Sequence, residues 1–296
     1  MNRSLLILLG GLLASAAWAE ADDAGAPVRS LKRGVCANQL SVEDARALSA
    51  GVTWYYNWHF QPERPLPGVD LAFYPMVWGD APEYFTGFTN ALAGGPPPPC
   101  VLVLNEPNLR GQAFLPPERA AALYQRVKAV TDARGIRLIG PHMALGSSTE
   151  ASITAFDPIQ QQDVTYTYMV PYLDAFYHFL GGTGPGAIAV HSYGKLDELK
   201  WLIGMLEKTY PGREIWVTEF AWWDAANEQE EMEYLTAAVD LFERTPSVAK
   251  YAWFMARLSK EKRMSLLTDT PGELTELGKL YLRLPVHAAT PDRNDT

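Results

Sequence analysis

The sequence predicts a single α/β domain with the (β/α)8 barrel fold. Its 296 residues exceed what one small core needs and suit one large domain. Short runs rich in Val, Ile, Tyr, Phe and Trp alternate with helical segments, and eight such units fill roughly 250 residues. An open, doubly wound sheet has the same alternation, but no glycine-rich phosphate loop follows the first predicted strand. The polar residues at the strand ends therefore decide between the two folds.

The element boundaries follow from local signals. Ser41 is a typical helix N-cap, with acidic residues in the first turn after it. Pro117 and Gly135 mark the start and the end of the helix after the fourth strand. A Pro-rich loop follows the second strand, and a last helix is expected from about 273 to 284. The eight predicted strands are 34–38, 52–58, 70–78, 101–108, 136–144, 187–194, 214–223 and 251–257.

The N-terminus has the features of a secretory signal peptide. Arg3 precedes an apolar run that ends at Trp18, and Ala17 and Ala19 form an A-x-A cleavage signal. The run is too short for a comfortable membrane span, so we expect a secreted or periplasmic protein with no membrane association after cleavage. The predicted organisation is a signal peptide (1–19), a polar lead-in (20–30), the barrel domain (31–285) and a C-terminal tail (286–296).

Composition narrows the possible partners. The formal net charge of −9 argues against a nucleic-acid partner, which would need a basic face, and suits a neutral or weakly charged substrate. Cys36 and Cys100 permit one disulfide in an exported chain, although their positions in predicted strands favour two free, buried thiols. No cluster of Cys and His has zinc-binding spacing. We expect a monomer that uses no metal and no cofactor.

Two glutamates stand at the ends of predicted strands. Glu106 follows Asn105 in "NEP" after the apolar fourth strand, and Glu219 lies in "TEF" of the seventh. In a barrel, the C-terminal strand ends surround the mouth of the active site. The period of two predicts that each glutamate shares the inward face of its strand, Glu106 with Leu102 and Leu104, and Glu219 with Ile215 and Val217.

Two facing carboxylates are the usual catalytic residues of glycoside hydrolases. One, when protonated, donates a proton to the leaving oxygen, and the other attacks the anomeric carbon as a carboxylate. Like charges placed close together raise one pKa, which keeps one group protonated near neutral pH. A single glutamate at a strand end is most often solvated or in a salt bridge. Glu106 and Glu219 together, on strands four and seven, favour catalysis.

The motifs resemble glycoside hydrolase family 128 of clan A, whose members mostly act on β-1,3-glucans. The resemblance rests on "GVTWYYNW", "DLAFYPMVWG", "NEPN", "AIAVHSYG", "IWVTEFAWW" and "YAWF", which lie on six of the eight strands. It implies that Glu106 is the acid/base, that Glu219 is the nucleophile, and that configuration is retained. Family members more often have Asp where this chain has Asn108, which affects fine specificity and leaves the pair intact.

Further residues are candidates for substrate contact. Asn105 is placed to bind the sugar 2-hydroxyl, as in the related clan, and Tyr193 to orient the nucleophile. His191 either orients the acid/base or binds a sugar hydroxyl, or it is a histidine at the barrel top with no substrate contact. Trp253 is a candidate floor for the sugar at the cleavage point. The other candidates are the possible stacking platforms Trp58, Trp78, Trp222 and Trp223, together with Asn57 and His142.

The predicted function is a retaining hydrolase of β-1,3-glucan, with two alternatives. One is the same barrel acting on mannan, xylan or an exported biofilm polysaccharide. The other is a carbohydrate-binding barrel without turnover, which the intact glutamate pair disfavours. The loops "QPERPLPG" after strand two and 145–165 after strand five are expected to form the cleft walls, whereas "GGPPPP" lies on the opposite face. The sequence leaves endo and exo action open.

Overall fold

The computed structural model describes residues 29–182, 184–260 and 262–286. The predicted signal peptide (1–19), most of the predicted lead-in and nearly all of the predicted tail lie outside the described residues. Within the described ranges, no helix is both long and apolar enough to cross a membrane.

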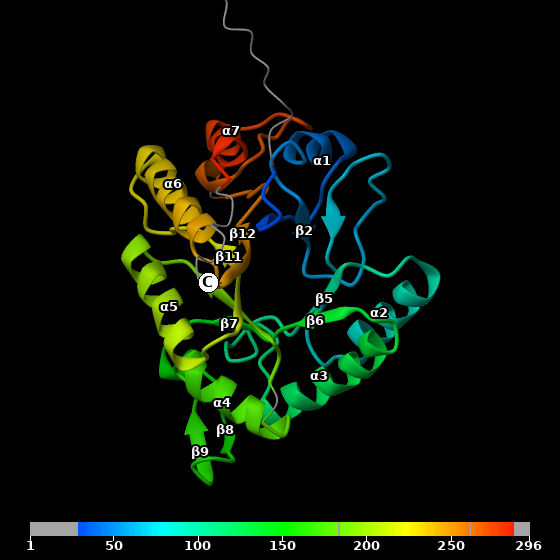
Figure 1. Ribbon diagram of the computed structural model, residues 1–296, viewed down its shortest axis with the longest axis vertical. Helices are drawn as coiled ribbons and strands as arrows, with labels where there is room; N and C mark the ends of the chain where they lie inside the picture. The colour runs from blue at the N-terminus through cyan, green and yellow to red at the C-terminus, as the bar shows by residue number, and fades with distance from the viewer. Residues whose placement is uncertain (1–28, 183, 261, 287–296) are drawn as a thin grey trace, which may run out of the picture.

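The chain forms one mixed α/β domain around two parallel sheets (Figure 1). Seven strands form the larger sheet, in the order β3 (Ala72–Phe73), β2 (Trp54–Tyr56), β1 (Arg33–Cys36), β12 (Val248–Trp253), β11 (Glu214–Phe220), β10 (Ala187–Ser192) and β7 (His142–Ala144). Three strands form the smaller sheet, in the order β4 (Met76–Val77), β5 (Cys100–Val103) and β6 (Arg137–Ile139).

Two of the predicted strands are divided between the sheets. The predicted third strand supplies β3 to the larger sheet and β4 to the smaller one, and the predicted fifth strand supplies β6 and β7 in the same way. Pro75 lies between β3 and β4, and Pro141 lies between β6 and β7. Proline has no N–H to donate to a strand ladder, which accounts for a break at each position. The two shared segments connect the sheets into one parallel framework.

Helices surround the strands in Figure 1. They are α1 (Val42–Leu48), α2 (Pro82–Gly94), α3 (Pro117–Asp132), α4 (Met169–Phe179), α5 (Leu196–Thr209), α6 (Glu228–Arg244) and α7 (Glu276–Arg283). The Ser41 side chain accepts a hydrogen bond from Asp44 N, which confirms the predicted cap of α1. The loop after β7 contains a 3-10 turn, η1 (Thr149–Ala151), and an antiparallel hairpin of β8 (Thr154–Asp157) and β9 (Gln162–Thr165). A second 3-10 turn, η2 (Lys262–Met264), precedes α7.

The strands alternate between two buried layers. One layer packs against the helices and includes Val35, Tyr55, Val101, Val190 and Tyr251. The other is enclosed by the strands themselves and includes Cys36, Trp54, Tyr56, Cys100, Leu102, Ala189, Trp216 and Ala252. Cys36 and Cys100 are buried free thiols, which confirms the favoured prediction for both. The inner layer continues along the strands to their C-terminal ends.

At the end of β5, the predicted facing was wrong for Leu104. Leu102 lies in the inner layer, but Leu104 packs with Val103 in the layer that faces the helices. Leu104 and Glu106 have φ values of 65° and 44°, in the left-handed region that side chains other than glycine seldom adopt. The strand therefore ends at Val103. The direction of the Glu106 side chain is set by the left-handed backbone after the strand and not by strand alternation.

The predicted facing was also wrong on β11. Ile215 and Val217 pack against the helices, whereas Trp216 lies in the inner layer. The register between β10 and β11 shifts after Val217, so that His191 pairs with Glu219. An irregularity of this kind moves the next side chain to the other face of a strand. Glu219 thus reaches the inner side through a bulge that the residue pattern did not show.

Candidate active site

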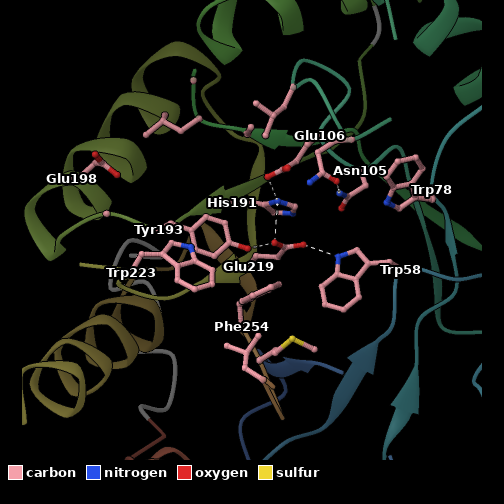
Figure 2. A pocket seen from close by; sticks show the side chains of 18 of the residues that line it. Trp58, Trp78, Asn105, Glu106, His191, Tyr193, Glu198, Glu219, Trp223 and Phe254 are labelled. Atoms are coloured by element: carbon pink, nitrogen blue, oxygen red, sulfur yellow. Dashed lines mark hydrogen bonds and ion pairs between the residues drawn. The ribbon is translucent and has the colours of Figure 1, made fainter. Parts of the chain in front are cut away.

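A cavity of about 910 Å3 opens at the C-terminal ends of the strands. Both glutamates lie at its centre (Figure 2). Eight of the twelve predicted site residues line it: Trp58, Trp78, Asn105, Glu106, His191, Tyr193, Glu219 and Trp223. They come from the ends of strands far apart in the sequence, so the fold brings the predicted pair together.

Glu219 is held by three uncharged donors. The Trp58 indole Nε1 and the Tyr56 hydroxyl both donate to Glu219 Oε1, over 2.8 Å and 2.9 Å. The Tyr193 hydroxyl donates to Oε2 (Figure 2). Burial and the nearby carboxylate of Glu219 raise the pKa of Tyr193, so its hydroxyl stays protonated and remains a donor. The Glu219 carboxylate is therefore fixed in position and accepts hydrogen bonds on both oxygens.

Glu106 has a titratable partner instead. His191 Nδ1 lies 2.8 Å from Glu106 Oε1 and 3.4 Å from Glu219 Oε2. Burial alone would lower the pKa of His191, but the carboxylates of Glu219 and Glu106 outweigh burial, and the pKa is raised. His191 Nε2 is buried and has no hydrogen-bond partner among the described residues. His191 thus bridges the two carboxylates with one nitrogen.

The two carboxylates and the imidazole are close together. One side-chain atom each from Glu106, His191 and Glu219 lie within 4.8 Å of one another. Such a trio also has the donor types that bind a metal ion. His191 Nδ1, however, already contacts both carboxylates, which is the arrangement of a proton-sharing group. The prediction that catalysis uses no metal remains a prediction.

Asn105 and Asn108 support the loop that carries Glu106. Asn105 Nδ2 donates to Gln112 Oε1 over 3.0 Å, and its Oδ1 is buried without a partner among the described residues. The Asn108 amide both donates to Ala144 O and accepts from Ala144 N. Asn108 is fully buried in these two bonds, so it anchors the loop to β7.

Trp253 and His142 were predicted to contact substrate, and the structure places both in the core. Trp253 is fully buried on the helix side of β12, where its Nε1 donates to Met264 O and its ring packs edge-on against Phe220. On β12 the inner face belongs to Ala252, and Phe254, the next residue along that face, lines the cavity instead. The aromatic residue of strand eight at the site is therefore Phe254.

His142 is fully buried below the cavity. Its Nε2 lies 3.3 Å from Ile139 O, which can only accept, so Nδ1 accepts from the Thr218 hydroxyl over 2.8 Å. Burial and the neighbouring His191 lower the pKa of His142 to about 3. His142 is thus a neutral residue of the framework, not a substrate contact.

Trp222 and Asn57 also lie outside the cavity lining. Trp222 lines a separate pocket of about 470 Å3 between the starts of α5 and α6 and contacts the Tyr234 ring. Asn57 Nδ2 donates to Gln61 O and stabilises its own loop. The neighbours Trp223 and Trp58 point into the cavity in their place.

The predicted cleft walls were right for one loop. Leu145 and Gly146, at the start of the 145–165 segment, line the cavity. No residue of "QPERPLPG" does so within the described chain; Gln61 and Pro62 instead line a pocket of about 360 Å3, together with Gly94 to Pro96 of the "GGPPPP" region. The predicted wall from the Pro-rich loop was therefore wrong.

Several site residues were not predicted. Tyr56 donates to Glu219 Oε1, Phe254 supplies an aromatic wall, and Gln112 and Glu198 line the cavity. Tyr56 had a signal, since it alternates with Trp54 and Trp58 on one face of strand two. Gln112 and Glu198 had none, because they lie in a loop and on a helix with no periodic relation to the strand ends.

The comparisons with known proteins agree with this geometry. The model of the glycosyl hydrolase catalytic core matches residues 34–281. No curated protein sequence matches the chain.

Three solved structures are similar along nearly their whole length. A subgroup II endo-β-1,3-glucanase of glycoside hydrolase family 128 from Sorangium cellulosum is 32% identical, covering 87% of this chain and 100% of that one, with a TM-score of 0.72. The corresponding subgroup II enzyme from Pseudomonas viridiflava is also 32% identical, covering 88% and 100%, with a TM-score of 0.73. A curdlan-specific subgroup III exo-β-1,3-glucanase from Blastomyces gilchristii, in complex with glucose, is 25% identical, covering 85% and 97%, with a TM-score of 0.64.

The family model spans most of the described chain, and the two subgroup II enzymes exceed 30% identity over their full length. Two facing glutamates at strand ends, in a cavity lined by aromatic and amide side chains, fit the same conclusion. The chain therefore belongs to glycoside hydrolase family 128, and it is a glycoside hydrolase.

Proposed function

We propose that the protein cleaves β-1,3-glucan with retention of configuration, with Glu219 as nucleophile and Glu106 as acid/base. The observation that carries the proposal is the contrast between the two carboxylates. Three uncharged donors hold both oxygens of Glu219, whereas Glu106 Oε1 accepts its hydrogen bond from His191, whose Nδ1 lies 2.8 Å from Glu106 and 3.4 Å from Glu219 Oε2. A nucleophile needs a fixed carboxylate, and an acid/base needs a proton that moves.

In the first step, a Glu219 oxygen attacks the anomeric carbon and the bond to the leaving oxygen breaks. Glu106 donates its proton to that oxygen from Oε2, while Oε1 accepts the hydrogen bond from His191 Nδ1. The products are a glycosyl ester on Glu219 and a free sugar hydroxyl on the departing chain. Donors on Glu219 hold the attacking carboxylate in place and limit the cost of orienting it.

In the second step, Glu106 acts as the base. Its carboxylate takes a proton from water, and the water oxygen attacks the anomeric carbon. The ester bond to Glu219 breaks, and the leaving carboxylate regains its hydrogen bonds from Tyr56, Trp58 and Tyr193. Two inversions at the same carbon give net retention.

The spacing of the carboxylates supports retention. Oxygens of Glu106 and Glu219 lie within 4.8 Å of each other. Retaining glycosidases place the two groups about 5–5.5 Å apart, whereas inverting enzymes leave about 6.5–9.5 Å for a water molecule. A pair of carboxylate oxygens within 4.8 Å of each other lies nearer to the retaining range than to the inverting one.

Several observations support a neutral glucan as substrate. The subgroup II relatives from Sorangium cellulosum and Pseudomonas viridiflava are both endo-β-1,3-glucanases. The cavity holds exposed aromatic surface on Trp223 for sugar stacking, and the amide side chains of Asn105 and Gln112 line it beside the glutamates. The net charge of −9 opposes anionic polysaccharides.

A polysaccharide panel tests the proposal directly. Purified protein is offered laminarin, curdlan, cellulose, xylan and mannan, with product sizing and NMR of the newly formed anomeric centre. We expect cleavage of the β-1,3-glucans with the β-anomer formed first. A first product of α configuration contradicts retention, and efficient cleavage of xylan or mannan alone contradicts the substrate.

We also propose that the strands close into a (β/α)8 barrel and that the protein is exported as a monomer. Closure is supported by the two segments that contribute to both sheets and by the bridge between Asn105 and His142. Export is supported by the apolar run from Leu5 to Trp18 and its A-x-A signal. N-terminal sequencing of the mature protein, where we expect Glu20 first, tests the export proposal.

A further inference from the structure

Two tryptophans in the described part of the chain expose more than a third of their side chains. Trp223, 39% exposed, lines the catalytic cavity. Trp201, 52% exposed, lies on α5 outside that lining. A single exposed apolar side chain is ordinary on a protein surface. Trp201 differs from an ordinary exposed residue because its helix also contributes to the wall of the cavity.

Helix α5 connects Trp201 to the cavity wall. Glu198, in the first turn of α5, lines the cavity and is seen at its edge in Figure 2. Its carboxylate lies directly against Gly194, another lining residue, where any Cβ would collide with it. Residues three apart on a helix share one face, so Trp201 lies one turn beyond Glu198 on the same side.

The loop after β7 adds a second aromatic ring at the same place. The Tyr168 ring lies 6.3 Å from the Trp201 ring, centroid to centroid, with 40° between their planes. Tyr168 forms an antiparallel bridge with Gly146, which lines the cavity. The two aromatic residues are thus joined to the cavity wall from both sides, through Glu198 and through Gly146.

The bridge holds Tyr168 rigidly. Ser147 N donates to Thr167 O, and Met169 N donates to Leu145 O, both over 3.0 Å. A Cβ at Gly146 would come within 2.8 Å of Thr167 O and 3.7 Å of the Tyr168 ring, so this close approach requires glycine. A platform that is already ordered loses little conformational entropy when a ligand binds.

We propose that Trp201 and Tyr168 form a distal subsite, where a neutral β-glucan chain that leaves the cavity past Glu198 stacks on the two rings. This subsite rests on the proposed function. Aromatic faces suit the C–H faces of pyranose rings, and the carboxylates of Glu198 and the exposed Asp197 accept hydrogen bonds from sugar hydroxyls. Asp197 is paired with Lys200 over 3.7 Å, so the Glu198 carboxylate is the charge that disfavours an anionic polysaccharide.

The subsite favours long chains and internal cleavage. A short oligosaccharide that fills only the cavity does not reach Trp201, whereas a polymer contacts both places at once. Contact at the distal rings therefore adds to the affinity of polymers alone. The chain-length dependence of kcat/KM is the property that this subsite determines.

Trp201→Ala tests the subsite, with Leu31→Ala as the matched control. Leu31 is another exposed apolar residue, 76% exposed, but it precedes β1 at the opposite end of the strands from the cavity. The measurement is kcat/KM on laminari-oligosaccharides of increasing length and on soluble laminarin. We expect the ratio of kcat/KM for polymer to that for trisaccharide to fall about three- to tenfold in Trp201→Ala. Trp201→Phe should restore part of the ratio, and Leu31→Ala should keep it.

A second measurement separates binding from turnover. Calorimetric titration of laminarin into Glu219→Gln, with and without Trp201→Ala, should show the same loss of affinity for the polymer. If the wild-type protein cleaves β-1,3-glucan but Trp201→Ala and Leu31→Ala have the same polymer-to-trisaccharide ratio of kcat/KM, the subsite proposal is wrong and the proposed function stands. Wild-type protein that neither binds nor cleaves any β-1,3-glucan overturns the proposed function, and the subsite with it.

Discussion

Glu219 and Glu106 stand at equivalent strand ends but in different surroundings. Glu219 receives hydrogen bonds from Tyr56, Trp58 and Tyr193, none of which changes its charge near neutral pH. Glu106 accepts its hydrogen bond from His191, a titratable side chain whose Nδ1 also lies 3.4 Å from Glu219 Oε2. The difference shows how one fold gives two identical side chains different surroundings: neutral donors hold both oxygens of Glu219, and a titratable imidazole lies 2.8 Å from Glu106 Oε1.

The largest expected effect comes from exchanging each carboxyl group for an amide. Glu219→Gln should abolish turnover on every substrate, because no attacking oxygen remains. Glu106→Gln should slow laminarin cleavage by a factor of about 10²–10⁴ but spare the first step on a dinitrophenyl glucoside, whose leaving group needs no proton. Steady-state and pre-steady-state kinetics on both substrates check this, and circular dichroism verifies folding. Equal losses for the two variants on the activated substrate would contradict the assigned roles.

Mutations can distinguish the core packing next to Glu219 from the contacts on its cavity side. Trp253 lies on the helix side of β12 against Phe220, the residue after Glu219. Trp253→Ala should lower the free energy of unfolding by about 3–5 kcal/mol, as expected for a fully buried aromatic residue. Trp223→Ala, at an exposed cavity position, should change stability little and weaken oligosaccharide binding. Urea unfolding and calorimetry measure both; a stable Trp253→Ala variant with weakened sugar binding would return Trp253 to the site.

These two tryptophans show what the sequence could predict. The strand-forming segments and both glutamates follow from apolar runs that end in polar motifs, although the third and fifth predicted strands are each divided between the two sheets. The period of two holds inside regular strands, so Trp54, Tyr56 and Trp58 are correctly placed on one face. The assignment of Trp253 failed because strand eight presents Ala252 and Phe254 inward, and nothing in "YAWF" shows which alternate set does so.

Irregular backbone limited the rest of the prediction. Glu106 reaches the cavity through left-handed residues after β5, and Glu219 through a register shift in β11. Each irregularity moves a side chain from one face to the other, and neither contains a glycine or proline that would signal it. Glu106 and Glu219 therefore lie in one cavity, although the face assignment that predicted this was wrong in detail. Trp58 also has a positive φ, of 60°, and backbone strain of this kind collects at functional sites.

The donors on Glu219 offer a finer test of the comparison. Trp58→Phe and Tyr56→Phe each remove one hydrogen bond to Glu219 Oε1 and keep an aromatic ring. A hydrogen bond to a charged group contributes about 1.5–3 kcal/mol, so each variant should lose about ten- to a hundredfold in kcat. Tyr56 is buried and Trp58 lines the cavity, so only Trp58→Phe should also raise KM. Unchanged kcat in both variants would show that these donors do not position the nucleophile.

The smallest expected effect is a change in pH dependence from the two neighbouring histidines, whose rings lie 6.2 Å apart. The pKa of His191 is raised on folding, so its contribution to stability is complete below its unfolded pKa and is lost as pH rises through the folded pKa. The pKa of His142 is lowered to about 3, so between about 3 and 6.5 the unfolded chain binds more protons there and stability falls as pH falls. The two slopes oppose each other, and the variants separate them.

His191→Asn should therefore steepen the loss of Tm on acidification, and it should also change the pH profile of kcat, because Glu106 loses its titratable partner. His142→Gln should flatten the loss of Tm and leave the kcat profile in place, since that residue contacts Thr218 and not a catalytic carboxylate. If the two variants shift the kcat profile equally, the distinction between a framework histidine and a proton-sharing histidine fails.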